Sequence, residues 1–396
     1  MTAEKEYFVY LLRCFLNGET PKGRVVDFDN LFHIADINDV GGIIAHEVLL
    51  TDEKTKPKGK QLSECKQVVG LTIKEHEERQ KAFEVIDSAL TKCGIDRIYV
   101  KGIVIGDKYP VKEFRTCGDI DVIVRQNEYR ESIEKLKTEG VSFSEPIGTE
   151  AASCHVLGTT IEIHRHHDVK SEYFNDIFSL CQNGENGVYQ LGEYDHLLYV
   201  LCHLAKHLTQ NGAGVRMLMD IDVLIRSIDN FNEEEFYSLC EKAGRLKTAQ
   251  VLLSLCNYWF DTPVNSLIDF NETPALLNNL ESIIIDGGSF GFEVSSLSDF
   301  HIMNNIGKSG KVNSFTKVKT LFSLAFPPKQ YIMTYYEYLY KKPYLLPFAY
   351  INRGYDAVFK RGKHSKKTVS NIINKDTNAL VQFELLNELE IERDYT

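Results

Sequence analysis

The sequence predicts an α+β protein in which a strand-containing region, residues 95–225, is embedded between N-terminal and C-terminal helical regions, residues 1–94 and 226–396. Two observations support this class. Apolar residues recur at helical spacing up to residue 94 and again after residue 171, whereas short apolar runs separated by glycines and polar turns fill the stretch between them. A chain of 396 residues suits two or three domains of roughly 100–200 residues each.

Helical spacing marks three segments of the first region. Tyr7 to Asn17 has its apolar residues on one face and is followed by Gly18, a residue type that commonly ends helices. Leu31 to Leu50 has the same character, and Gln67 to Lys92 sets apolar positions among Glu, Lys and Arg before a terminal glycine. The first 94 residues are therefore expected to be helical throughout.

The second region contains strand signals. Ile98–Val100, Ile120–Val124 and Thr160–His164 are short apolar or alternating runs, and a helix is expected from Tyr129 to Glu139. After residue 171 the helical pattern returns and is expected to hold to the end. Eight tyrosines gather between Tyr331 and Tyr355, a density more typical of helix packing than of base stacking.

Composition excludes several classes of protein. Hydrophobic residues at 43% and charged residues at 26% are near globular averages, which argues against a disordered or collagenous chain. No apolar run reaches the roughly 20 residues of a membrane helix, and Met1–Tyr7 lacks the basic-then-apolar order of a signal peptide, so a cytoplasmic location is expected. Nine cysteines without a Cys-x-x-Cys pair indicate reduced thiols.

Charge is unevenly distributed along the chain. From Lys308 to Lys367 there are 13 Lys and Arg against two acidic residues, a balance of +11. Because the whole chain carries −11, the other 336 residues carry −22. This basic segment, residues 308–367, indicates a surface for phosphate or nucleic acid, with a solvated helix face as the alternative.

The strongest chemical signal is Gly118-Asp119-Ile120-Asp121-Val122-Ile123-Val124. Side chains alternate along a strand, so Asp119 and Asp121 share one face while the alternate apolar residues face the core. Neighbouring carboxylates repel each other unless a cation lies between them, and a hard divalent ion with oxygen ligands is the usual cation. Alone, Asp-x-Asp is a weak signal, because acidic pairs on surface strands are common.

A second strand repeats the design in Thr160-Ile161-Glu162-Ile163-His164. If the two strands are neighbours, three carboxylates converge, from Asp119, Asp121 and Glu162. Such a group suits two-metal phosphoryl or nucleotidyl transfer, in which ions about 3.5–4 Å apart hold the attacking and leaving oxygens. The third carboxylate can also accept the proton of the attacking hydroxyl.

These residues resemble the uncharacterised nucleotidyltransferase family of the DNA polymerase β superfamily. The resemblance rests on Lys101-Gly102 after the first strand, Arg115 before Gly118-Asp119-Ile120-Asp121, and the later Glu162-Ile163-His164. It continues in His203-Leu204-Ala205-Lys206-His207 and Arg216–Ile221, and weakly around Phe326-Pro327-Pro328. The superfamily's usual Gly-Ser is Lys101-Gly102 here, so this position offers no serine hydroxyl for phosphate binding.

The resemblance implies a polymerase β-like nucleotidyltransferase palm, a mixed sheet with flanking helices, as the catalytic core. It implies a nucleoside triphosphate such as ATP as substrate and Mg²⁺, with Mn²⁺ as the alternative, as cofactor. Asp119, Asp121 and Glu162 would be the catalytic metal ligands, with Glu162 also the candidate base. Nucleotide-binding candidates are Lys101, Gly102, Arg115, Gly118, Lys206 and His207. The alternatives are that Lys101 is an ordinary lysine at a strand end, that Arg115 forms a surface ion pair, and that Gly102 is a plain turn glycine.

A histidine-rich helix is expected from His196 to Gln210. Its polar arc includes His203, Lys206 and His207, and a zinc site is disfavoured because the glutamate of His-Glu-x-x-His is missing. Phosphate or substrate contact by Lys206 and His207 is the better hypothesis, with a solvated polar face as the alternative. His164, His203 and Arg216 are weaker candidates for substrate contact. By strand alternation His164 shares the face of Glu162, so it is also a candidate to orient a carboxylate.

The sequence thus predicts a Mg²⁺-dependent nucleotidyltransferase that moves NMP from an NTP to a hydroxyl-bearing acceptor and releases pyrophosphate. The acceptor is open between RNA, protein and a small molecule, and the basic segment favours RNA. Two alternatives remain: a metal-dependent phosphohydrolase, and a catalytically inactive protein that binds nucleotide or a partner. The preferred NTP and the oligomeric state are not visible in the sequence.

Overall fold

The computed structural model describes residues 1–144, 147–148, 150–210, 212–289, 297–306, 310–329, 332–333, 336, 338–360, 362–374 and 377–392. Contacts divide the chain into two units, the first made of residues 1–206 and 214–269 and the second of residues 207–213 and 270–396. The divisions expected after residues 94 and 225 fall within the first unit and stay predictions. Among the described residues, no helix combines the length and apolarity needed to cross a membrane.

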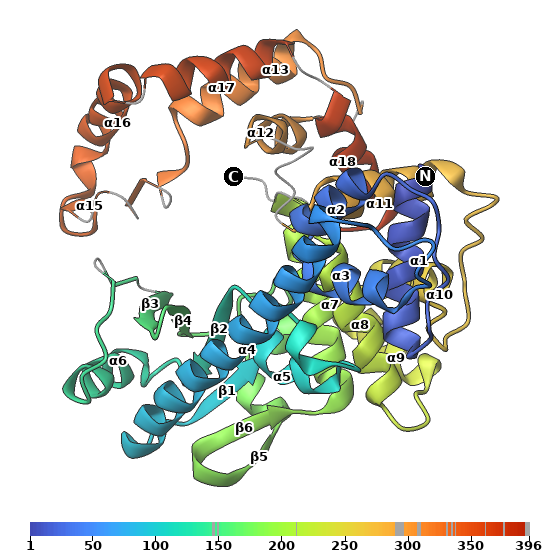
Figure 1. The fold of residues 1–396 in the computed structure, drawn as a ribbon. Helices are drawn as coiled ribbons and strands as arrows, with labels where there is room; N and C mark the ends of the chain where they lie inside the picture. The colour runs from blue at the N-terminus through green and yellow to red at the C-terminus, as the bar shows by residue number, and fades with distance from the viewer. Residues whose placement is uncertain are drawn as a thin grey trace. The chain divides into compact units, whose positions relative to one another are not determined.

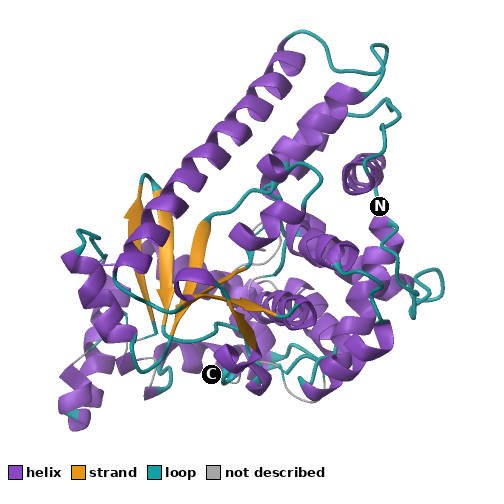
Figure 2. Ribbon diagram, turned by 90° about the horizontal axis from the view of Figure 1, so that it is seen from below, coloured by secondary structure: helices purple, strands orange, loops and turns teal. Residues whose placement is uncertain are grey.

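A mixed sheet of six strands organises the first unit (Figures 1 and 2). The strand order is β3-β4-β2-β1-β6-β5, with β2 parallel to β4, β1 parallel to β6, and the other neighbours antiparallel. The strands are β1 (Arg97–Val100), β2 (Asp119–Val124), β3 (Ala151–Val156), β4 (Thr159–His164), β5 (Cys181–Asn183) and β6 (Val188–Leu191). The predicted α+β class is confirmed.

One face of this sheet forms a hydrophobic core. Ile120, Val122 and Val124 of β2 lie buried there with Ile161 and Ile163 of β4. Helices α4 (Lys60–Lys92) and α6 (Tyr129–Thr138) cover this face through the buried side chains Ile86, Leu90, Tyr129, Ile133 and Leu136. The predicted alternation is therefore confirmed, and the acidic residues between these positions project from the opposite face.

Three strands were absent from the sequence prediction. The expected helical pattern after residue 171 is wrong for Cys181–Leu191, which forms the hairpin of β5 and β6. This hairpin is the edge of the sheet and exposes Gln182 and Asn183, so it lacks the apolar alternation that marks a buried strand. β3 lies at the other edge and is built largely from small residues.

Helices form the rest of the first unit. The expected helix at Tyr7–Asn17 begins earlier, at Ala3, and ends at Gly18 in the left-handed conformation with φ 65°. The segment Leu31–Leu50 forms two helices, because Asp39 between them has a φ of 56° that interrupts helical hydrogen bonding. The remaining helices here are α1 (Ala3–Asn17), α2 (Phe28–Ile37), α3 (Gly41–Leu50), α5 (Gly102–Ile105), α7 (Glu193–Gln210), α8 (Val215–Ser227), α9 (Glu233–Lys242) and α10 (Leu246–Phe260), with α7 continuing into the second unit.

The described part of the second unit is helical. Its longer helices pack in the pairs α12–α13, α12–α17, α12–α18 and α13–α17. The basic segment extends from the loop before α13 into α17. The helices are α11 (Pro274–Glu281), α12 (Leu297–Asn305), α13 (Ser314–Ala325), α15 (Tyr338–Lys341), α16 (Leu346–Tyr355), α17 (Gly362–Asn374) and α18 (Thr377–Glu388).

A fully buried arginine joins α4 to β1. The guanidinium of Arg97 donates to the Asp87 carboxylate (Nε to Oδ1, 2.9 Å), to Thr91 Oγ1 (2.7 Å) and to Asn186 O (3.0 Å). The hydroxyl of Tyr99 also donates to Asp87, at 2.7 Å. This network fixes the start of β1 against the helix that covers the core.

We predict that Asp87→Ala lowers the free energy of unfolding by about 3 kcal/mol, because it leaves the buried Arg97 cation without its carboxylate. Asp96→Ala is the matched control. Asp96 pairs with Arg125 at 2.9 Å, but both side chains are about one-third exposed, so its loss should cost at most about 1 kcal/mol. Urea unfolding of both variants measures the difference; equal losses would contradict the role of Arg97.

Candidate functional site

The pairing of β2 with β4 brings the predicted carboxylates together. In this parallel pair Asp121 lies opposite Glu162, and Asp119 lies opposite Thr160. All three acidic side chains project from the sheet face that is not covered by α4 and α6. The condition set by the sequence, that the two strands be neighbours, is met.

Asp121, Glu162 and His164 form a group able to hold a metal ion. One ligand atom from each lies within 4.8 Å of the others, and this is the one such group among the described residues. His164 Nε2 is 2.8 Å from Asp121 Oδ1 and 3.4 Å from Glu162 Oε2. His164, a candidate to orient a carboxylate or to contact substrate, therefore lies with Asp121 and Glu162 in one group, called here the acidic cluster.

Asp119 stands beside this group without belonging to it. Burial and the charge of Asp121 raise the pKa of the Asp119 carboxyl, while the charge of Lys101 lowers it. The charge of Lys101 therefore does not fully offset the burial of Asp119 and its repulsion by Asp121. A divalent ion near Asp119 and Asp121 would add positive charge there.

The pKa values of Asp121 and His164 show how the cluster is balanced. Burial alone would raise the pKa of Asp121, but the hydrogen bond from His164 and the charge of Lys101 lower it. Burial alone would lower the pKa of His164, but hydrogen bonds to Asp121 and Glu162 raise it to about 9. At neutral pH this imidazole is therefore protonated and acts as a counter-ion to the two carboxylates.

Lys101 connects the acidic cluster to Asp168, a further carboxylate that the sequence analysis missed. Its Nζ lies 3.1 Å from Asp121 Oδ2 and 2.8 Å from Asp168 Oδ2. Burial would lower the pKa of Lys101, but the charges of Asp121 and Asp168 raise it above its ordinary value, so the amine stays charged. Its backbone is unusual, with φ 60° and ψ −133°, a conformation that L-residues other than glycine rarely adopt.

Asp168 is the centre of a basic cluster. Besides Lys101, its carboxylate lies 3.2 Å from Lys206 Nζ and 3.4 Å from His203 Nδ1, and it accepts a 2.6 Å hydrogen bond from the hydroxyl of Tyr199. Burial alone would raise the pKa of Asp168, but the hydrogen bond from His203 and the two lysine charges hold it well below its usual range. Asp168 follows the end of β4, where strand alternation no longer predicts side-chain direction.

Helix α7 supplies three of these partners. Tyr199, His203 and Lys206 are separated by four and three residues, so they lie on one face of the helix and meet Asp168 together. Part of the polar face of this helix therefore contacts Asp168, through Tyr199, His203 and Lys206. His207 falls in the second unit, and phosphate contact by it stays a prediction.

Arg115 lies in a buried ion pair. Its Nε and Nη2 donate to the two oxygens of Asp220 at 2.9 and 2.6 Å, and its Nη1 donates to Thr116 O. The hydroxyl of Tyr109 donates to the same carboxylate at 2.7 Å. Arg115 thus fastens the segment before β2 to α8, and all three guanidinium nitrogens already have partners in the protein.

The two predicted glycines and Arg216 differ in their surroundings. A Cβ at Gly102 would lie 2.5 Å from Cys117 Sγ, so packing requires glycine there. A Cβ at Gly118 would meet nothing within 4 Å, so the protein's own packing does not require glycine at that position. Arg216 pairs with Asp39 and donates to Thr116 Oγ1 at 2.9 Å, next to the start of β2.

We predict that Lys101→Gly is more stable than Lys101→Ala by about 1 kcal/mol, because both lack the amine but only glycine relieves the backbone strain. Lys112, exposed in a short helical turn, provides the control: there Ala should be the more stable. Denaturant unfolding of the four variants decides the matter. An Ala variant at residue 101 as stable as the Gly variant would rule out strain.

Comparison with known proteins agrees with this geometry. Residues 24–261, more than half of the chain, match the family described as uncharacterised nucleotidyltransferase. They include the whole acidic cluster together with Asp119, Lys101 and Asp168. The weak resemblance near Pro327 lies outside the match. Comparison with curated proteins and with solved structures gave no match. The chain therefore belongs to the uncharacterised nucleotidyltransferase family and is an enzyme that transfers phosphorus-containing groups.

Proposed function

We propose that this enzyme is Mg²⁺-dependent and transfers NMP from a nucleoside triphosphate to a hydroxyl group of an acceptor, releasing pyrophosphate. The observation that carries the proposal is the register of β2 with β4, which sets Asp121 opposite Glu162 on a sheet face where Lys101 lies beside them. Carboxylates next to a fixed cation suit a metal-bound triphosphate better than a neutral substrate.

The donor set fits the metal. Asp119, Asp121 and Glu162 would hold Mg²⁺, since carboxylate oxygens are the ligands that this hard ion prefers, and they also suit Mn²⁺. The protonated His164 would hold Asp121 in place by hydrogen bonding, and it would be a ligand to Mn²⁺ only in its neutral form, after losing its proton. When bound, the ion neutralises charge on the phosphoryl oxygens.

Lys101 and Lys206 would bind the triphosphate. Both amines contact the Asp168 carboxylate, at 2.8 and 3.2 Å, so the two positive charges lie in the same region. Gly118, where the protein leaves space, would allow a phosphate to approach the backbone. Phosphate contact by Arg115 stays a prediction from the resemblance, and its buried pair with Asp220 favours a positioning role.

Glu162 would act as the general base. Its side chain is 34% exposed, so an acceptor can reach it, and it lies opposite Asp121. The acceptor oxygen attacks the α-phosphorus while its proton passes to Glu162. The bond from the α-phosphorus to the bridging oxygen breaks, and pyrophosphate leaves with that oxygen. A hydrolase would use water in place of the acceptor, but the family favours transfer.

We predict that the wild-type enzyme, incubated with each α-³²P-labelled NTP, Mg²⁺ or Mn²⁺ and fractionated cell extract, labels one of the RNA, protein or small-molecule fractions. Asp119→Ala/Asp121→Ala should abolish this label because the metal ligands are gone. Asp107→Ala, at an exposed acid in the turn after α5, is the control that should label normally. Release of labelled NMP without any labelled acceptor would instead support the phosphohydrolase.

We also predict that Asp168→Asn raises KM for the NTP at least about tenfold with a smaller change in kcat, because Lys101 and Lys206 lose the carboxylate that positions them. Asp195→Asn is the matched control, since Asp195 accepts a 2.7 Å hydrogen bond from Tyr173 but contacts neither lysine. Steady-state kinetics of the two variants, with Tm values, provide the measurement. An unchanged KM, or an equal rise in both variants, would contradict the role.

A further inference from the structure

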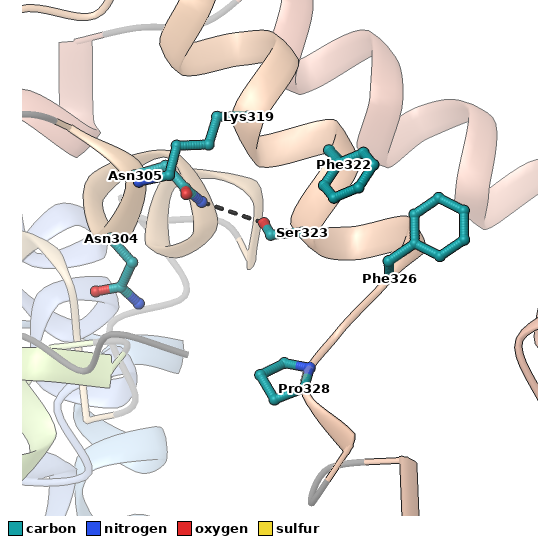
Figure 3. A pocket seen from close by; sticks show the side chains of 7 residues that line it. All are labelled: Asn304, Asn305, Lys319, Phe322, Ser323, Phe326 and Pro328. Atoms are coloured by element: carbon teal, nitrogen blue, oxygen red, sulfur yellow. Dashed lines mark hydrogen bonds between the residues drawn. The ribbon is translucent and has the colours of Figure 1, made fainter. Parts of the chain in front are cut away.

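A pocket of about 240 Å³ lies in the second unit between α12 and α13 (Figure 3). All of its lining residues lie between residues 304 and 328, far along the chain from the acidic cluster. Asn304 and Asn305 come from α12, and the other side chains come from α13 and the chain that follows it. The lining residues are Asn304, Asn305, Lys319, Phe322, Ser323, Phe326 and Pro328.

Asn304 is the unexplained group in this pocket. It is only 5% exposed, yet neither its Nδ2 nor its Oδ1 has a hydrogen-bond partner among the residues that the structure describes. The neighbouring Asn305 is satisfied, because its Nδ2 donates to Ser323 Oγ at 3.2 Å and to His301 O at 2.9 Å. An amide buried without partners is costly, and a ligand with an adjacent donor and acceptor would remove the cost.

Aromatic rings border the pocket nearer the surface. Phe322 is 64% exposed and Phe326 is 52% exposed, so both rings are open to solvent, whereas Asn304 is buried. Their ring centroids are 5.0 Å apart at 40°, so the two rings do not stack on each other. Phe315, Val318, Phe322 and Phe326 form one exposed stripe along α13 and its end. Exposed ring faces next to a buried amide suit a flat ligand that also forms hydrogen bonds.

The charge around the pocket is positive. Lys319 is part of its lining, and the pocket residues of α13 lie within the basic segment, whose balance is +11. Most of the chain is acidic, so this segment is where an anion is least repelled. The ligand should therefore carry negative charge as well as a flat polar ring.

We propose that this pocket binds an unpaired nucleotide of a nucleic acid strand. The base would stack on Phe322 or Phe326 and pair with the Asn304 amide, and Lys319 would contact the adjacent phosphate. Adenine is the expected base, since its N6 and N7 match an asparagine amide. The assignment of this strand as the NMP acceptor rests on the proposed function; the binding itself does not. An anionic membrane would contact the aromatic stripe and the lysines but would not form hydrogen bonds with the buried Asn304 amide, so it does not explain that residue.

Fluorescence anisotropy with the full-length protein tests the proposal. The probes are labelled single-stranded oligo(rA), oligo(rU), oligo(dA) and an abasic strand of equal length, with free AMP as competitor and phosphatidylserine vesicles in a sedimentation assay. The variants are Asn304→Leu and Phe322→Ala. Their controls are Asn278→Leu on the exposed side of α11 and Phe348→Ala, which is 62% exposed on α16 outside the pocket.

The proposal expects oligo(rA) to bind more tightly than the abasic strand. Phe322→Ala should weaken binding about tenfold, and Asn304→Leu should remove the base preference. Because the Asn304 amide has no partner within the described part of the chain, Asn304→Leu should keep or raise Tm, by about 2 °C. Equal binding of oligo(dA) would support the pocket and show that the ribose hydroxyl is not read.

Three outcomes would overturn the proposal: a lower Tm for Asn304→Leu with unchanged binding, binding to vesicles but to no strand, or binding of AMP alone. The failure of the proposed function looks different. Strand binding that depends on Asn304, in an enzyme that transfers no label to any acceptor, would support the pocket and contradict NMP transfer. If both pocket variants transfer label to RNA as well as the wild-type enzyme does, the pocket proposal alone is contradicted.

Discussion

Electrostatic repulsion between carboxylates on one sheet face is the constraint on which the rest of this structure depends. Asp121 and Glu162 lie opposite each other, with Asp119 two residues away on the same face. Without nearby positive charge such a group would protonate or separate. The protein supplies that charge through Lys101 and through the protonated His164. The remaining features of the site follow from the need to keep those cations in place.

Asp168 and α7 meet that need. A lysine amine is carried on a flexible four-carbon stem, so one acidic partner alone would hold it only loosely in the site. Asp168 gives Lys101 a second anchor and brings Lys206 to the same point, while Tyr199 and His203 hold Asp168 itself. The sheet separates this polar assembly from the core on its other face: the Glu162 side chain is 34% exposed, whereas Ile161 and Ile163 are fully buried.

The sequence was sufficient where side-chain direction follows from periodicity. Alternation on two strands was enough to predict the acidic face of the sheet, and helical spacing was enough to predict the face of α7 that carries His203 and Lys206. Periodicity fails beyond the end of a strand, which is why Asp168 was missed, and at exposed edges, which is why β5 and β6 were missed. Nor can spacing show which partner a charge will take: Arg115 pairs with Asp220, more than 100 residues later.

The backbone of Lys101 has a consequence for redesign of this enzyme. A design procedure that scores backbone strain alone would replace Lys101 with glycine, because the φ of 60° favours glycine. That choice would also remove the cation that, among the described residues, contacts both Asp121 and Asp168. Stability-directed libraries of this protein should therefore keep residue 101 fixed and take their gains elsewhere.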